Sequence, residues 1–443
     1  MGTKVAKFGG SSLSEATQFR KVRAIVEEDA SRRYIVPSAP GKRDPKDEKI
    51  TDLLYKCHAL AKDGHSFLEV FARIKERYQS ICTELGLALD LSPEFDAIEK
   101  AIAAGASADY TASRGEYLNG KILAAYLGYA FVDPATMIFF DQHGQFDAEK
   151  TQAVLSRELA RYERAVIPGF YGSSPDGQIR TFSRGGSDIT GAIVARGVQA
   201  SLYENWTDVS GFLMADPRIV PNPKPIREIT YRELRELAYM GATVLHDEAI
   251  FPVREAKIPI NIKNTNDPGD PGTLIVNDNG SIRTPGSITG IAGRKGFTII
   301  AIEKTLMHSE LGFGRKLLSV IEEHGISFEH MPSGIDTISL VIADSQLNDK
   351  LEQVLIGIKR VCKPDAIEVV RDIALIATVG LGMAYTPGIA AKLFTALAEA
   401  GINVRMIDQG SSEINIIVGV ENKDFEAAVR QIYQAFVPRD PDK

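Results

Sequence analysis

The chain has 443 residues, which is enough for two or three domains with full hydrophobic cores. Apolar residues make up 44% of the sequence and charged residues 25%, as in ordinary globular proteins. The net charge of −7 argues against nucleic acid or an anionic membrane as a partner, so local basic groups must meet any anionic substrate.

Nothing in the sequence predicts export or membrane insertion. No apolar run reaches the roughly 18 residues of a membrane span, and a strand pattern starts directly after the first four residues, without a signal peptide. Cys57, Cys82 and Cys362 are scattered without CxxC spacing, which is typical of buried thiols in a reducing compartment. We therefore expect a cytoplasmic protein.

The first predicted strand, Val5–Phe8, ends in the glycine pair Gly9-Gly10, and a helical pattern follows it. Bare backbone N–H groups at a helix N-terminus bind anions, usually phosphate. Taken alone, Lys7 fits a solvated strand end as well as a phosphate site, and the glycine turn favours the phosphate site. Residues 12–15, Ser-Leu-Ser-Glu, fit a capping box at the start of the helix.

Further short apolar runs alternate with helical patterns up to residue 285. Strands are expected at 34–36, 130–132, 165–167 and 201–203, and a polar loop at 41–49 precedes a helix face that begins at Ile50. This rhythm predicts a mainly parallel sheet between helical layers.

A second glycine turn, residues 183–188 (Ser-Arg-Gly-Gly-Ser-Asp), also opens a helix. Two such turns suggest phosphoryl transfer between two anionic ligands. Arg184 suits bidentate recognition of a carboxylate, whereas Asp188 is in isolation also explained as a helix cap. No GxxxxGK[ST] motif occurs, so a Walker P-loop is excluded.

Other polar residues follow predicted strands or open helices. Ser38 ends the second strand, and Glu116 is expected at the start of a helix, where an acidic residue serves the helix dipole or faces a substrate ammonium. Thr207-Asp208 and the triplet 216–218 follow another strand. Because the carboxyl ends of parallel strands meet at one crevice, we group these residues.

Residues 265–287 are rich in Pro, Gly, Asn and Asp, which predicts a boundary. Beyond it, residues 297–342 align with residues 373–418 without a gap, and strands are expected at 298–302, 337–342, 374–378 and 413–418. Each copy fits a ferredoxin-like βαββαβ unit whose last strand the pattern leaves open. The predicted domains are a catalytic domain at 1–285 and ligand-sensing repeats at 286–364 and 365–443.

These motifs, taken in order, resemble aspartokinases of the amino-acid-kinase superfamily over essentially the whole chain, and the repeat is similar to their paired ACT domains. The motifs are Lys7-Phe-Gly-Gly-Ser-Ser12, Val36-Pro-Ser-Ala39, Gly115-Glu116, Phe182-Ser-Arg-Gly-Gly-Ser-Asp188 and Trp206-Thr-Asp-Val-Ser-Gly211 followed by Ala215-Asp-Pro-Arg218. The resemblance implies a three-layer α/β/α sandwich with a mainly parallel sheet, plus two ferredoxin-like ACT units.

The resemblance also implies that ATP with Mg²⁺ phosphorylates the side-chain carboxylate of L-aspartate, the first step of lysine, threonine and methionine biosynthesis. Lys7 would stabilise the transferring phosphoryl group, and Asp188 would orient Lys7. Arg184 would pair with a carboxylate of aspartate and Glu116 with its ammonium, while Ser38, Thr51 and Ser187 line the pocket. The implied nucleotide site is Lys7, Gly9, Gly10, Ser11, Thr207, Asp208, Phe212, Asp216, Arg218, Lys257 and Lys263. No residue is assigned to a metal.

Each repeat has a glycine-containing loop after its first strand, at 307–312 and 383–388, which offers N–H groups to an amino-acid carboxylate. The resemblance suggests lysine, alone or with threonine, as feedback inhibitor, bound in a homodimer or dimer of dimers. The implied regulatory residues are Met307, Ser309, Gly312, Phe313 and Glu329. A purely structural role in dimerisation is the alternative.

Two other functions remain open from the sequence. A related kinase acting on glutamate or acetylglutamate is disfavoured by the ACT-like pair, which those relatives generally lack. A catalytically silent amino-acid sensor is disfavoured by the presence of Lys7, Arg184 and Asp188 together. No dehydrogenase-like pattern follows, so we expect a monofunctional enzyme.

Overall fold

The computed structural model describes residues 2–183, 185–242, 247–278 and 288–437, and for 247–250 it describes the backbone only. The chain forms two compact units. The first comprises Met1–Phe212, Pro225–Tyr231 and Thr243–Asn279, and the second comprises Leu213–Lys224, Arg232–Ala242 and Gly280–Lys443. Two short segments that precede residue 285 therefore pack with the C-terminal repeats. The domain limits drawn from the sequence stay a prediction.

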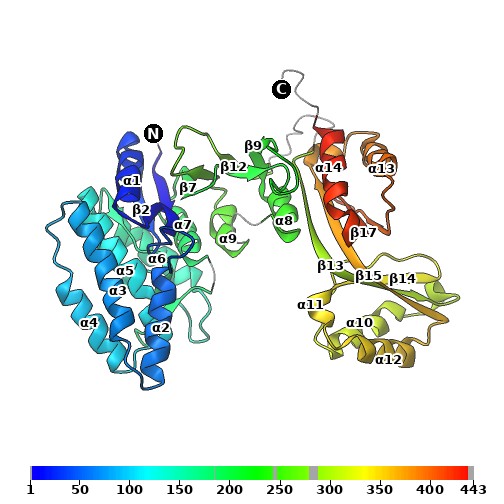
Figure 1. Ribbon diagram of the computed structural model, residues 1–443, viewed down its shortest axis with the longest axis horizontal. Helices are drawn as coiled ribbons and strands as arrows, with labels where there is room; N and C mark the ends of the chain where they lie inside the picture. Colours follow the sequence, from blue (N-terminus) through cyan, green and yellow to red (C-terminus); the bar gives the residue numbers. More distant parts are fainter. Residues whose placement is uncertain (1, 184, 243–246, 279–287, 438–443) are drawn as a thin grey trace. The chain divides into compact units, whose positions relative to one another are not determined.

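An eight-stranded sheet forms the centre of the first unit (Figure 1). Its order is β10-β12-β11-β7-β1-β2-β4-β3, and only the β11–β12 pair is antiparallel. The mainly parallel α/β sheet predicted from the sequence is confirmed. The strands are β1 (Lys4–Phe8), β2 (Arg32–Pro37), β3 (Ala130–Phe131), β4 (Ala165–Val166), β7 (Leu202–Thr207), β10 (Glu228–Thr230), β11 (Ile260–Asn264) and β12 (Thr273–Val276).

Two small ladders and several helices complete the chain up to residue 279, and of these α8 (Tyr231–Tyr239) belongs almost entirely to the second unit. The ladders pair β5 (Tyr171–Ser173) with β6 (Ile179–Thr181) and β8 (Phe212–Leu213) with β9 (Pro225–Ile226). The helices are α1 (Ala16–Glu28), α2 (Ile50–Lys62), α3 (Leu68–Glu84), α4 (Ser92–Ala103), α5 (Ala108–Leu127), α6 (Ala148–Leu159), α7 (Gly186–Gly197), α8 (Tyr231–Tyr239) and α9 (Asp247–Glu255), with 3₁₀ turns η1 (Gly10–Leu13) and η2 (Pro134–Thr136).

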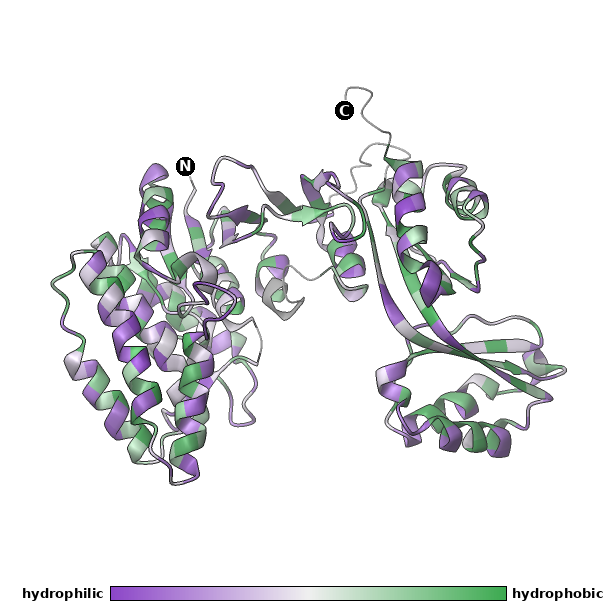
Figure 2. Cartoon of the chain, in the orientation of Figure 1, coloured by the Kyte–Doolittle hydropathy of each residue, from purple (hydrophilic) through white to green (hydrophobic). Residues whose placement is uncertain are grey.

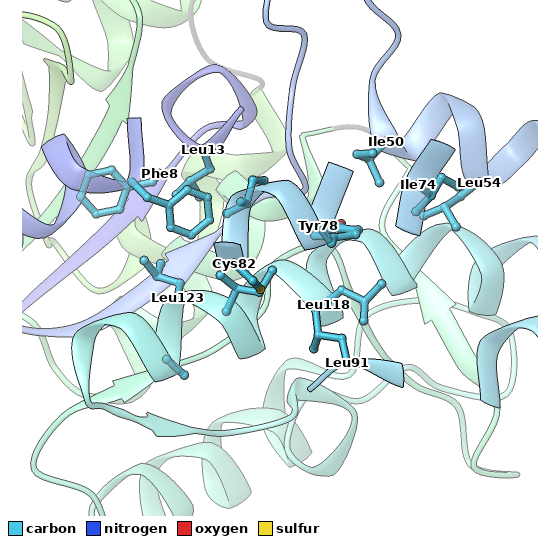
Figure 3. Packing of buried hydrophobic residues seen from close by; sticks show 14 of the residues in the cluster. Phe8, Leu13, Ile50, Leu54, Ile74, Tyr78, Cys82, Leu91, Leu118 and Leu123 are labelled. Carbon is cyan, nitrogen blue, oxygen red and sulfur yellow. The ribbon is translucent and has the colours of Figure 1, made fainter. Parts of the chain in front are cut away.

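Successive side chains of β1 point to opposite faces of the sheet and so contact two different helical layers. Ala6 and Phe8 join the core of α1 to α5, whereas Lys7 faces α7. Figure 3 shows this core, which includes Phe8 and Leu13 together with inward residues of α2, α3 and α5. In Figure 2 the same helices carry apolar and polar faces, the pattern of helices packed on one side. The three-layer arrangement expected from the sequence is present.

The described part of the chain contains no helix that is long and apolar enough to cross a membrane. Cys57, Cys82 and Cys362 are buried free thiols, as the sequence predicted. Burial raises the pKa of the Cys57 thiol to about 12, so this thiol stays protonated near neutral pH.

A five-stranded sheet in the order β14-β13-β15-β17-β16 forms the second unit. The strands are β13 (Gly290–Glu303), β14 (Thr337–Ala343), β15 (Ala366–Val379), β16 (Met406–Asp408) and β17 (Asn415–Glu421). The helices are α10 (Phe313–Glu323), α11 (Asp344–Leu347), α12 (Leu351–Cys362), α13 (Ile389–Glu399) and α14 (Phe425–Phe436), with 3₁₀ turns η3 (Met307–Ser309), η4 (Leu381–Met383) and η5 (Asn422–Asp424). All four predicted repeat strands lie in β13, β14, β15 and β17, although β17 starts two residues later than expected.

The repeats share a long ribbon in which β13 pairs antiparallel with β15 over nearly its whole length (Figure 1). The second half of β13 pairs with β14 of the first repeat, and the second half of β15 pairs with β17 of the second repeat. The first half of β13 therefore supplies the last strand of the second repeat, and the first half of β15 supplies that of the first. Gly296, at a φ of 88°, marks the irregularity between the two halves.

Candidate active site

The candidate active site lies where parallel strands β1, β2, β7 and β11 end at one edge of the sheet. In register, Phe8 lies beside Pro37 on one side and Trp206 on the other. The backbone continues this pairing into the loops, because the Gly9 N–H donates to the Trp206 carbonyl at 2.9 Å and the Ser38 N–H donates to the Phe8 carbonyl at 3.0 Å. The glycine turn and the segment after β2 are thus neighbours, as expected for a ligand crevice at strand ends.

Lys7 is the centre of a buried polar triangle. Its Nζ lies 2.5 Å from Oδ1 of Asp188 and 3.3 Å from Oδ1 of Asn205, and the Asn205 amide donates to Asp188 at 2.9 Å. The Lys7 side chain is 9% exposed and that of Asp188 is 15% exposed, so the pair is screened little by solvent. The structure therefore brings together the two residues predicted to be catalytic.

Asn205 is a member of this triangle that the sequence reasoning missed. It lies beside Lys7 in the β1–β7 register and has the same parity along its strand, so both side chains face α7. Its neighbours Glu204 and Trp206 face the opposite layer, where Glu204 pairs with Arg32 at 2.7 Å. Aligning the two parallel strands and following the side chains that share a face with Lys7 would have identified Asn205.

The glycine turn packs backbone to backbone against the segment after β2. A Cβ at Gly41 would lie 2.7 Å from the Gly10 carbonyl carbon, so only glycine fits there without a shift. The turn enters a 3₁₀ helix, and the capping box predicted at residues 12–15 is wrong. The Ser12 hydroxyl instead bonds the Thr265 hydroxyl at 2.8 Å, just beyond the end of β11, and α1 starts without a side-chain cap.

Glu116 lies inside α5, not at a helix start as the sequence predicted. It is 5% exposed, and burial raises its pKa to about 8 although the Ala39 N–H and Arg114 oppose this shift. Among the described residues, no partner contacts its Oε2, and the same is true of Oδ1 of Asn119, one turn later. Asn119 Nδ2 donates to the Ser38 carbonyl at 2.6 Å. Two buried acceptors beside the 38–39 segment suit a cationic ligand group.

The other predicted substrate residues surround these groups, with one exception. Ser38 continues β2, Thr51 is the second residue of α2, and the buried Ser187 is the second residue of α7. Arg184 lies outside the described residues. The carbonyl of Asp188 accepts from the Tyr203 hydroxyl at 3.0 Å, which ties the first turn of α7 to β7.

The predicted nucleotide residues divide between the two units. Thr207, Asp208, Phe212, Lys257 and Lys263 belong to the first unit, together with the glycine turn of residues 9–11. Lys263 lies next to Trp206 in register, and its Nζ is 5.0 Å from the centre of the indole ring.

Asp216 and Arg218 belong to the second unit, and they pair with each other at 2.6 Å. Lys257 is exposed, in a left-handed backbone position with a φ of 56°.

The predicted regulatory residues occupy the first repeat. Met307 and Phe313 are buried, and Gly312 caps the start of α10 in the left-handed region with a φ of 75°. The Glu329 carboxylate lies 3.4 Å from Arg294 of β13, and it accepts a hydrogen bond from the Tyr239 hydroxyl of α8. Burial first, and then this carboxylate, raise the pKa of Tyr239 to about 12. Glu329 therefore already has a cationic partner within the chain.

Comparison with known proteins agrees with this geometry. The profile of the amino acid kinase family matches residues 2–264, and the profile of an ACT domain matches residues 376–436. The chain is 40% identical to Aspartokinase 3 of Bacillus subtilis (strain 168) over an alignment of 448 residues that covers 98% of each chain.

Solved structures give the same answer. The crystal structure of an aspartate kinase from Clostridium acetobutylicum, described as an allosteric enzyme, superposes with a TM-score of 0.92 at 58% identity and covers 99% of this chain and 100% of that one. E. coli aspartokinase III in complex with aspartate and ADP superposes with a TM-score of 0.73 at 25% identity and covers 98% of this chain and 99% of that one. The chain therefore belongs to the amino acid kinase family and, within it, to the aspartate kinases that carry ACT domains.

Proposed function

We propose that the centre formed by Lys7, Asp188 and Asn205 transfers the γ-phosphoryl group of ATP to the side-chain carboxylate of L-aspartate. A carboxylate oxygen attacks the γ-phosphorus, the bond to the β-bridging oxygen breaks, and 4-phospho-L-aspartate and ADP form. The observation that carries this proposal is the buried contact of 2.5 Å between Lys7 and Asp188 at the carboxyl edge of the sheet.

The residues act by position and charge. A carboxylate is already ionised at neutral pH, so the nucleophile needs no general base. Charge develops on the transferring group, and a fixed ammonium in a screened site stabilises it. Asp188 and Asn205 hold the Lys7 ammonium in one place, so little reorganisation is needed at the moment of transfer. Gly9, Gly10 and Ser11 would contact the phosphates through their backbone.

Mg²⁺ fits this site as a companion of the nucleotide. In kinase sites this ion is commonly held by one or two carboxylates together with substrate phosphates. The described residues gather no group of three His, Cys, Asp or Glu side chains that could hold a metal ion. Asp208, which is exposed just after β7, is the carboxylate we assign to it. The ion would neutralise phosphate charge.

The aspartate pocket is proposed on the other side of the glycine turn. Glu116 and Asn119 offer the two buried acceptors that a substrate ammonium requires. Arg184 would pair with a substrate carboxylate, and Ser38, Thr51 and Ser187 would line the pocket. The nucleotide would occupy the side of Thr207, Phe212, Lys257 and Lys263. Asp216 and Arg218 belong to the second unit and are proposed as nucleotide residues by the resemblance alone.

Feedback regulation is proposed for the ACT repeats. E. coli aspartokinase III has been solved with lysine and aspartate, and its chain superposes on this one with a TM-score of 0.74 at 25% identity. We infer that lysine, alone or with threonine, binds at the 307–313 loop in a homodimer. This feedback suits an enzyme that opens lysine, threonine and methionine biosynthesis. Since Glu329 already pairs with Arg294, an effector ammonium would have to compete with that arginine.

The experiment is an acyl-phosphate assay in which hydroxylamine traps the product. The enzyme with ATP and Mg²⁺ should form hydroxamate from L-aspartate but not from L-glutamate or N-acetylglutamate. Lysine and threonine, separately and together, should lower the rate. Product from glutamate with none from aspartate would refute the proposed pocket, and equal rates at millimolar lysine and threonine would refute the proposed effectors.

A further inference from the structure

Arg77 of α3 is buried next to the segment that leads from Ser38 to Thr51. Its side chain is 6% exposed. One nitrogen, NH1, donates to the Gly41 carbonyl at 3.2 Å and to the Ser14 carbonyl at 3.5 Å, while NH2 contacts both carboxylate oxygens of Asp47 at 2.6 and 2.8 Å. A single guanidinium thus joins Gly41 and Asp47 of the 41–49 loop to Ser14, which follows the 3₁₀ turn η1.

Asp47 is the carboxylate partner of Arg77 inside the 41–49 loop, and we call the contacts of Arg77 with Ser14, Gly41 and Asp47 the clamp. The Asp47 carboxylate is 8% exposed and also accepts from the backbone N–H and the guanidinium of Arg43. Burial alone would raise the pKa of Asp47, but the hydrogen bonds from Arg43 and the charge of Arg77 outweigh it and hold that pKa well below its usual range. Asp47 therefore stays ionised at every pH at which the enzyme would be assayed.

The clamp acts on backbone that touches the proposed aspartate pocket. The Gly41 N–H donates to the Gly10 carbonyl at 2.8 Å, and the Ile50 N–H donates to the Pro40 carbonyl at 3.3 Å. The loop therefore leaves and returns at the segment whose Ala39 N–H contacts Glu116. The residue after Arg77, Tyr78, donates to the Gly115 carbonyl at 2.7 Å. Adjacent residues of α3 thus hold both walls of the pocket, and Figure 3 shows Tyr78 in the core.

We propose that Arg77 is a positioning residue for aspartate: it fixes the 38–51 segment so that Ser38, Thr51 and Glu116 meet the substrate. This inference rests on the proposed aspartate pocket. The glycine turn has anchors of its own, since Gly9 is bonded to Trp206 and Ser12 to Thr265. Loss of Arg77 should therefore displace the residues that bind aspartate far more than those that bind ATP.

We expect the loss of Arg77 to raise KM for aspartate much more than KM for ATP. Misplacing a binding group by about 1 Å costs up to about 100-fold, so Arg77→Ala should raise KM for aspartate at least about tenfold and leave KM for ATP within about threefold. Arg77→Lys should be intermediate, because an ammonium keeps the charge but cannot reach Asp47 and Gly41 at once. The matched control is Arg73→Ala, one turn earlier in α3, which removes an exposed ion pair with Glu48 of the same loop.

Guanidinium rescue separates positioning from general stability. Free guanidinium at tens of millimolar should lower KM for aspartate in Arg77→Ala towards wild type and should leave Arg73→Ala unchanged. If a folded Arg77→Ala enzyme keeps KM for aspartate within threefold of wild type, or raises both KM values equally, or does not respond to guanidinium, the proposal is overturned.

Two further variants keep the test decisive. If Arg77→Ala does not fold, Asp47→Asn serves in its place, because it keeps the shape of the loop and removes the charge partner, and an unchanged KM for aspartate would again overturn the role of Arg77. If the aspartate pocket itself is wrongly placed, Glu116→Gln will leave KM for aspartate unchanged, which distinguishes that error from an error about Arg77.

Discussion

The buried Glu116 makes aspartate binding depend on pH in a predictable direction. Its carboxyl has a pKa of about 8 without substrate, mainly because burial disfavours the charged form. A substrate ammonium requires the ionised form, since a protonated carboxyl offers no charge to it. The form that binds aspartate is therefore a minority near neutral pH.

The magnitude follows from the ionised fraction. With a pKa of about 8, roughly one tenth of the enzyme is ionised at pH 7 and roughly one hundredth at pH 6. Because the apparent dissociation constant rises as the competent fraction falls, kcat/KM for aspartate should rise about tenfold per pH unit from pH 6 to pH 8 and level off above that. Binding near pH 7 should release close to one proton.

Two measurements check this expectation. The first is kcat/KM for aspartate from pH 6 to pH 9 at saturating ATP. The second is titration calorimetry of aspartate in buffers of different ionisation enthalpy, which counts the released proton. Glu116→Gln should bind aspartate weakly at every pH and should lose the slope. A flat wild-type profile between pH 6 and 8, or a slope that survives in Glu116→Gln, would refute this reasoning.

The same carboxyl should lower stability at high pH. In the unfolded chain Glu116 ionises near its ordinary pKa of 4.5, but in the folded enzyme it holds its proton up to about 8. The folded state therefore binds more protons in this window, and stability falls as pH rises through it, by several kcal/mol at most. Glu116→Gln should melt at a higher temperature than wild type at pH 8.5, and this difference should shrink at pH 5.

The remaining predictions concern chemistry, substrate choice and regulation. Lys7→Ala or Asp188→Ala should lower turnover at least about 100-fold in the hydroxamate assay while the fold persists; near wild-type turnover would remove both from the mechanism. Asn205→Leu should lower kcat about tenfold with little change in either KM, because it only orients the other two. Arg184→Lys should weaken the binding of aspartate far more than that of ATP, and the reverse result would assign Arg184 to the nucleotide site. Glu329→Ala should relieve lysine inhibition by roughly 5–150-fold and spare basal activity; unchanged inhibition would exclude Glu329 from effector binding.

Local patterns were sufficient to predict several strands of the large sheet and both glycine turns, but not β10, β11 and β12. The run Val5–Phe8 and the glycines after it gave β1 and its turn, and the apolar spacing after Ile50 gave α2. The two glycine turns drew attention to Lys7 and Asp188, and the resemblance to aspartokinases implied that Asp188 orients Lys7. The structure brings the two side chains into contact. Such signals are read within a few residues of the chain, where strand and helix periods are strongest.

Contacts between distant segments could not be predicted in the same way. Asn205 reads as one more strand residue until the β1–β7 register sets it beside Lys7. Glu116 was expected at a helix start, but α5 continues through Gly115, where a Cβ would lie 2.9 Å from the Cβ of Ala39. Arg77 resembles a surface arginine on a helix, and only the folding back of the 41–49 loop buries it. In each case tertiary packing overrode the local preference.

The shared β13–β15 ribbon means that the second repeat is a circular permutant of a ferredoxin-like unit. Its last strand, the first half of β13, comes first in the chain, and the whole first repeat is inserted between that strand and the next one. A fragment that begins at residue 365 would lack this strand and expose the edge of β15, which invites aggregation.

The same connectivity shows how to obtain the second repeat as an independent module. Lys295 and Ala374 are directly paired across the ribbon. Replacing residues 296–373 with a two-residue Asn-Gly turn would join these partners as a hairpin, because such turns match the twist of paired antiparallel strands. The excised protein would keep every strand of the second repeat in its present register, and it would allow effector binding to that repeat to be measured without the first.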